Sequence, residues 1–150
     1  MTLQTAIFET IKSNLPDFTP YITSINDDGE DLDNRVLFGD FDFNKENVGI
    51  AFRGGIKPLR SMSDGHIFKR SIVAVMNYNT ADISDGYDYG NKVLDTLSSL
   101  LFVDVIDTDT NTKLGLINNI TIESDVNYLG KNANNNTNMF SLSFNINYSW

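Results

Sequence analysis

The chain has 150 residues, of which 41% are hydrophobic and 21% are charged, the composition of a globular protein of one domain. Its net charge of −9 and pI near 4.3 disfavour a general affinity for nucleic acid or acidic membranes. No apolar run approaches the roughly 18 residues that a membrane-spanning helix needs. The absence of cysteine excludes disulfides, thiol nucleophiles and thiolate metal sites.

The first predicted element is a helix from about Thr2 to Leu15, because apolar residues recur every four positions and Pro16 ends the run. The predicted apolar stripe consists of Leu3, Ile7, Ile11 and Leu15, with Phe8 beside them. Residues 17–47 show little periodicity, and residues 27–33 are predicted to form a solvated acidic loop. Within the irregular segment we expect three apolar anchors: Phe38, Phe41 and Phe43.

Two strands joined by a long loop are predicted next. Alternation around Ile50 indicates a short strand from Val48 that ends at Gly54-Gly55. A loop then runs to about Ile67. The apolar run within Phe68–Tyr78 predicts a central strand covered on both faces.

A second helix is predicted from Asp82, with Asp85 completing a capping box, to about Leu101. Its apolar stripe has helical spacing and consists of Tyr89, Val93, Leu97, Leu100 and Leu101. Gly86 and Gly90 lie four residues apart and therefore on one face, where we expect another backbone to approach closely.

The remainder of the chain is predicted to be extended. Strands are expected at Val103–Ile106 and Leu114–Glu123 around a polar turn, with an Asn-rich loop at residues 130–138. The clearest strand is Met139–Trp150, in which large apolar and small polar residues alternate. The apolar set is Phe140, Leu142, Phe144, Ile146 and Tyr148, and the polar set is Ser141, Ser143, Asn145 and Asn147. The layout predicts an α+β fold, a mostly antiparallel sheet with helices packed on one face.

Asp107, Asp109 and Asn111 begin like a calcium-binding loop. The sixth position is Thr112 where the bend requires Gly, and the twelfth is Asn118 where a bidentate Glu should close the coordination shell. A polar hairpin turn is the better interpretation. We therefore expect no metal site here.

Three residue types of a catalytic triad occur together in the predicted loop, at Ser61, Ser63, Asp64 and His66. Catalysis requires such residues to converge from rigid elements, and proximity within one loop does not indicate that. A hydrolase using Asp64 and His66 remains a minor alternative. We expect no enzyme activity, no catalytic residues and no cofactor.

Positive charge is concentrated between residues 53 and 70. Five basic residues against Asp64 give this stretch about +4 in a chain of −9, so the remainder carries about −13. The five are Arg53, Lys57, Arg60, Lys69 and Arg70. One interpretation is a solvated hairpin whose cations pair with acidic loops elsewhere in the chain. The other is a basic loop that contacts either DNA phosphates or a neighbouring copy of this acidic protein.

The order of elements resembles the tail terminator and tail-completion proteins of tailed bacteriophages, also described as minor capsid or head–tail joining proteins. Besides the first helix, the resemblance is carried by Ser71–Asn77, Asp85–Leu97 and Phe140–Tyr148. It implies a small sheet flanked by helices and a non-enzymatic structural role in the virion. The implied assembly is a ring, commonly a hexamer, at the phage neck between the tail tube protein and the head-side connector or adaptor.

The resemblance further implies that the protein assembles in the host cytoplasm and resides in the tail or neck of the virion. DNA would pass through the ring without sequence-specific binding, because an acidic lumen does not trap phosphates. The basic loop and the polar side of the last strand are then candidate contacts between subunits. Two alternatives stay open. One is another neck or head-completion ring protein of a podovirus-like virion, and the other is a monomeric ligand- or calcium-binding module that uses residues 27–33.

Overall fold

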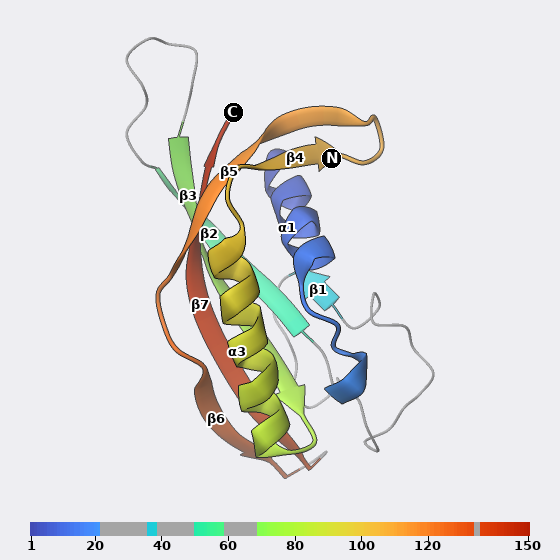
Figure 1. Ribbon diagram of the computed structural model, residues 1–150, viewed down its shortest axis with the longest axis vertical. Coiled ribbons are helices and arrows are strands. Elements are labelled where there is room, and N and C mark those ends of the chain that lie inside the picture. Colours follow the sequence, from blue (N-terminus) through green and yellow to red (C-terminus); the bar gives the residue numbers. More distant parts are fainter. Residues whose placement is uncertain (22–35, 39–49, 59–68, 134–135) are drawn as a thin grey trace.

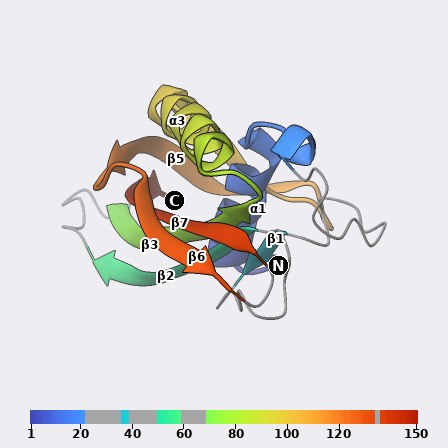
Figure 2. The same cartoon turned by 90° about the horizontal axis from the view of Figure 1, so that it is seen from below.

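The computed structural model describes residues 1–21, 36–38, 50–58, 69–133 and 136–150. Within these ranges the chain forms two α-helices, a short 3-10 helix and seven strands (Figure 1). The strands form one sheet, and both α-helices pack on the same face of it (Figure 2). The fold is the predicted α+β domain with a mostly antiparallel sheet.

Helix α1 spans Leu3–Asn14, close to the predicted bounds. The Thr2 side chain caps it by accepting a hydrogen bond from the Thr5 amide at 3.1 Å, which satisfies one of the free donors of the first turn. The buried side of the helix consists of Ala6, Ile7, Phe8 and Ile11. The predicted helix and its stripe are confirmed. A 3-10 helix, η1, follows at Thr19–Tyr21.

Strand β7, Thr137–Ser149, lies in the middle of the sheet. One edge pairs along almost its whole length with β3, Lys69–Thr80. The other edge pairs with β5, Thr112–Ile122, and then with β6, Asn127–Asn132. All three pairings are antiparallel, so the strand that alternation predicted most clearly is hydrogen-bonded to three others.

Strand β2, Ile50–Pro58, pairs with β3, and the predicted end at Gly54-Gly55 is wrong. Both glycines continue the ladder, because the neighbouring strand supplies backbone partners that outweigh the weak strand preference of glycine. Strand β1, Val36–Phe38, adds the one parallel pairing among the described strands. Phe38 therefore lies in a strand rather than in an irregular segment. Phe41, Phe43 and residues 27–33 lie outside the described ranges.

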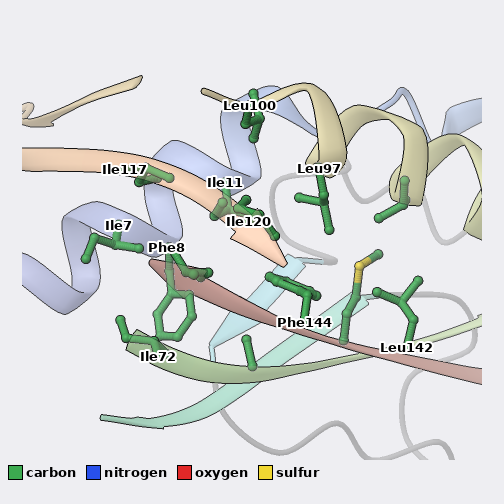
Figure 3. Close-up of a cluster of buried hydrophobic side chains, with 14 of the residues drawn as sticks. Ile7, Phe8, Ile11, Ile72, Leu97, Leu100, Ile117, Ile120, Leu142 and Phe144 are labelled. Carbon is green, nitrogen blue, oxygen red and sulfur yellow. The ribbon is translucent and has the colours of Figure 1, made fainter. Parts of the chain in front are cut away.

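The core lies between the two helices and one face of the sheet. Figure 3 shows Ile7, Phe8 and Ile11 of α1 directed toward the sheet, with Ile11 near Ile120 of β5 and Phe8 above Ile72 of β3. All five apolar residues of the last strand are buried, as predicted: Phe140, Leu142, Phe144, Ile146 and Tyr148. The predicted cover on both faces of β3 holds only in part: on the side away from the helices Val73 is 39% exposed, whereas Ser71, Asn77 and Asn79 are buried.

Helix α3 spans Ile83–Ser99 and follows the N-cap residue Asp82. The predicted capping box is wrong, since the Asp82 side chain forms no cap hydrogen bond. Four of the five predicted stripe residues are buried: Tyr89, Val93, Leu97 and Leu100. Leu101 is 58% exposed, because the helix ends two residues earlier and the chain turns toward β4.

Strand β4, Val103–Asp107, forms a hairpin with β5, as predicted. The expected loop at residues 130–138 is wrong at both ends, because β6 extends to Asn132 along the edge of β7 beyond β5, and β7 already begins at Thr137. Asn and Gly have low strand preference, so the sequence of β6 gives little local signal. The register shifts between Tyr128 and Gly130, and Gly130 has the positive φ of 113° that favours glycine.

Candidate functional site

The basic stretch is a pair of strands for most of its described length. Arg53 lies in β2 and Lys69 and Arg70 begin β3, in the regions where strands were predicted, whereas Lys57 was predicted in the loop and lies in β2, so the basic residues of the described ranges do not form a loop. The register keeps the backbone positions close, since Lys57 pairs with Ser71, the residue after Arg70. Arg60 lies outside the described ranges.

Lys69 and Arg70 are exposed at the end of the sheet where β7 finishes. The guanidinium carbon of Arg70 lies 5.4 Å from the centroid of the Trp150 ring, within the range of a cation–π interaction. Trp150 stacks on Tyr148 with centroids 5.6 Å apart. Burial raises the pKa of Tyr148, and the charge of Arg70 opposes this shift. We call Lys69, Arg70 and Trp150 the basic end.

The polar side of β7 faces away from the helices, as the alternation predicted. Its side chains are half-buried and form the polar face: Ser141, Ser143, Asn145 and Asn147. Asn147 links three strands, because it accepts a hydrogen bond from Ser71 of β3 at 2.5 Å and donates one to Thr121 of β5 at 3.0 Å. No described helix covers this side of the sheet (Figure 2).

Two further residues of the polar face are fixed by the segment that follows β5. The side-chain amide of Asn145 donates to a Glu123 carboxylate oxygen at 2.6 Å, and the Ser143 and Ser124 hydroxyls are 3.0 Å apart. The Ser143 backbone amide also donates to the Ser124 hydroxyl at 2.9 Å. The side-chain oxygen of Asn145 is buried and has no hydrogen-bond partner among the described residues. These side chains are therefore held in defined positions within one chain.

The opposite end of the sheet carries exposed apolar side chains that the sequence patterns did not single out. Four residues of α3 and β6 are 38% to 50% exposed and form the aromatic patch: Ile83, Tyr87, Tyr128 and Leu129. The Tyr87 and Tyr128 rings lie 5.4 and 5.3 Å from the buried Phe140 ring. The available signal was the position of Ile83 and Tyr87 off the buried stripe of α3, which predicts exposure.

A polar cluster joins η1 to α3. The Tyr21 hydroxyl donates to a carboxylate oxygen of Asp88 and accepts from the Lys92 ammonium, both at 2.6 Å. Burial and the Asp88 carboxylate raise the pKa of Tyr21. The hydrogen bond from Tyr21 lowers the pKa of Asp88, and hydrogen bonding to Tyr21 and Asp88 raises that of Lys92. Each residue has its partners within this cluster, which indicates a role in holding η1 against α3.

Evidence for a catalytic or metal site is absent from the described residues. Within them no group of three or more His, Asp or Glu side chains could hold a metal ion. Asp107 instead accepts hydrogen bonds from the amides of Asp109 and Thr110 in the predicted hairpin turn. The four residues with triad chemistry, at positions 61, 63, 64 and 66, lie outside the described ranges.

Comparison with known proteins gives no assignment. No protein-family model matches the sequence, and a search of curated proteins finds no matching relative. Across the described segments, neither helix has the length and apolar character needed to cross a bilayer. Function therefore has to be inferred from the polar face, the basic end and the aromatic patch.

Proposed function

We propose that this protein is a non-enzymatic structural subunit that assembles with copies of itself into a ring at the neck of a tailed bacteriophage, as a tail terminator or tail-completion protein. The ring would lie between the tail tube and the head-side connector. The observation that carries the proposal is the polar face of β7. It is a row of small uncharged side chains at the centre of the sheet, on the side that no described helix covers.

An uncharged row is unusual in this chain, which has 20 acidic residues. The cores of subunit interfaces are depleted in charge, because each buried charge must lose its hydration. The hydrogen bonds of Ser143 and Asn147 fix these side chains before any partner binds. Less rotamer entropy is then lost on association, which favours the polar face as a packing surface for another subunit.

The charge distribution supports the same role. A lumen lined by acidic groups repels phosphates and lets DNA pass without being retained. The basic end, in contrast, attracts an acidic surface, and every further copy of this protein supplies one. The basic end would therefore attract other copies of the protein, whereas the acidic surface would repel DNA. This combination suits a ring through which DNA moves.

The fold is compatible with the resemblance found in the sequence. A small, mostly antiparallel sheet with helices on one face leaves the other face available for neighbouring subunits. The three segments that carry the resemblance are β3, α3 and β7, which pack together around one core. Three features thus support the proposed ring: the sheet face without a described helix, the separation of basic and acidic residues, and the order of helices and strands.

Negative-stain electron microscopy of the purified protein tests the proposal. We expect wild-type rings with a central hole, and loss of rings in Ser143→Arg, which places a long charged side chain on the polar face. The variant should stay folded, because the main loss is the hydrogen bond to Ser124, worth about 1 kcal/mol. Its thermal melting should confirm this.

Asn91→Arg is the matched control, because Asn91 is exposed on α3, on the helix side of the sheet. Rings should persist in this variant. Rings that also persist in Ser143→Arg would contradict the role of the polar face. Wild-type protein that stays monomeric at every concentration and ionic strength would contradict self-assembly.

A further inference from the structure

The two ends of the sheet differ in chemistry. Strand β3 starts at the basic end and finishes at Thr80, about 36 Å away at the usual rise per residue of a strand. The register with β7 places Tyr78 beside Phe140, the ring against which the aromatic patch packs. The basic end and the aromatic patch therefore lie at opposite ends of the long axis (Figure 1).

The aromatic patch is built from two elements on one buried support. Tyr87 extends from α3 and Tyr128 from β6, and both rings contact Phe140 from outside. The Tyr128 hydroxyl also donates to the Asn138 side chain at 3.0 Å, which fixes the ring. Positioned aromatic rings expose apolar area at little cost in conformational entropy, as in recognition surfaces. Clustered exposed apolar side chains of this kind mark interaction sites.

Unpaired charges accompany each surface. Asp82 and Asp85 lie in the same turn of α3 as Ile83, and Asp125 precedes Val126, which packs against α3 at Gly90. None of these three carboxylates forms an ion pair with a described residue. At the other end, Lys69 and Arg70 also lack ion pairs within the described part of the chain.

We propose that the aromatic patch is the docking surface for the basic end of a second copy of this chain. The inference rests on the self-assembly proposed above and names the two surfaces that meet. Trp150 would pack against Tyr87 and Tyr128, and Lys69 and Arg70 would lie over the carboxylates of Asp82 and Asp85. Charge complementarity favours a second copy as the occupant, because the basic end carries two adjacent exposed cations and the aromatic patch lies beside two carboxylates.

Such a contact joins two different surfaces, so every copy that binds through one end keeps the other end available. Contacts of this type are heterologous, and they produce a closed ring when the rotation between successive copies divides a full turn. In the proposed ring, the basic end of each copy would therefore contact the aromatic patch of the next copy, and all copies would point the same way around the ring. The polar face would then pack alongside this contact rather than determine the direction of assembly.

Cross-linking tests the contact, and the chain is suited to it because it contains no cysteine. Lys69→Cys and Ser84→Cys place one thiol at each surface, and both native side chains are exposed. Arg70 remains as the cation of the basic end in the first variant. The two variants are mixed and treated with a short bismaleimide. We expect covalent heterodimers, and a yield that falls severalfold as NaCl rises from about 0.05 to 1 M, because screening weakens the charge contact.

Ser13→Cys, exposed on α1 away from the aromatic patch, replaces Ser84→Cys in the control mixture. Heterodimer yields no higher than in this control would overturn the docking contact, whether or not rings are seen by microscopy. Reversal of one charge gives an independent readout. Asp85→Lys should reduce the yield at least severalfold, whereas Asp95→Lys, exposed one helical turn or more from the patch, should not.

The two proposals fail differently. Wild-type rings without a Lys69→Cys to Ser84→Cys cross-link would overturn the contact and leave the proposed ring in place. Cross-linked chains that never close into rings would support the contact and contradict the ring. An unchanged cross-link yield in Asp85→Lys would overturn the assigned charge pairing.

Discussion

Gly86 and Gly90 are the residues whose size is most tightly constrained. A Cβ atom on Gly86 would lie 1.9 Å from an edge carbon of Phe140, and one on Gly90 would lie 2.3 Å from the Tyr78 hydroxyl. The sequence predicted a close approach on this face of α3 but attributed it to another backbone. The approaching groups are side chains, namely aromatic rings and Val126. Periodicity locates such a contact on a face but does not identify the partners, which lie between 12 and 54 positions away in the sequence.

Gly86→Ala should destabilise the protein by about 1–3 kcal/mol, because the new methyl group displaces the Phe140 ring from a filled core. This reverses the usual effect, since alanine normally stabilises a helix over glycine by about 0.5–1 kcal/mol. Urea denaturation measures the change. Asn91→Ala, exposed on the same helix, should give a small gain, and Phe140→Leu should reduce the cost of Gly86→Ala in the double variant. Equal stability of Gly86→Ala and wild type would contradict the packing.

At the level of elements, the β4–β5 hairpin depends on a charged turn. Asp107 accepts the Asp109 amide at 2.9 Å and lies 3.5 Å from the Met1 amino group. The hydrogen bond from Asp109 and the positive charge of that amino group lower the pKa of Asp107 below its usual value of 3.8, although burial opposes the shift. A lowered pKa in the folded state means that the carboxylate stabilises the fold above about pH 4, and that this contribution is lost as the pH falls through the folded-state pKa.

Asp107→Asn should therefore flatten the acid-side loss of stability, since an amide does not titrate between pH 2 and 5. The measurement is the melting temperature across that pH range for the variant and the wild type. Asp109→Asn is the control, because its side chain accepts no hydrogen bond from a described residue in the same turn. Parallel pH profiles for Asp107→Asn and wild type would show that the turn does not depend on this charge.

The helices and strands that could be predicted from the sequence are those whose apolar residues alternate with polar ones or recur at helical spacing. Strand β7 and helix α1 have such patterns, because each buries one side against the core. Strand β6 has no such pattern and forms because it pairs with β7. Strand β2 continues through two glycines because it pairs with β3. The polar face was predictable because its residues alternate along β7 with the apolar residues that are buried in the core. The aromatic patch was not, because it joins α3 and β6 only after folding.

At the scale of the whole molecule, β7 makes the unfolding of the described elements cooperative. Its backbone connects β3 on one side with β5 and β6 on the other, and its apolar residues contribute to the core shared with both helices. Without β7 the described sheet would separate into β1–β2–β3 on one side and β4–β5 on the other, and β6 would lose its partner. We therefore expect the described elements to unfold together rather than in separate units.

Phe144→Ala tests this at the middle of β7. It should cost about 3–5 kcal/mol, because a fully buried ring is replaced by a cavity. A single transition should remain, with fluorescence and far-UV circular dichroism giving the same midpoint. Leu129→Ala, half-exposed in the aromatic patch, should change stability by about 1 kcal/mol or less. Two separated transitions in Phe144→Ala would show that parts of the sheet are stable without its central strand.

The central position of β7 also affects synthesis. Each strand that pairs with β7 precedes it in the chain, so a ribosome releases β3, β5 and β6 before the strand that joins them exists. During that interval β3 and β5 each have one unpaired edge and β6 has no partner among the described strands, and unpaired edges are prone to pair with other chains. Products truncated before residue 137 would keep those edges open and should be removed by proteases or aggregate. Only chains translated through β7 can then complete this sheet, so translation itself would separate chains that can fold from those that cannot.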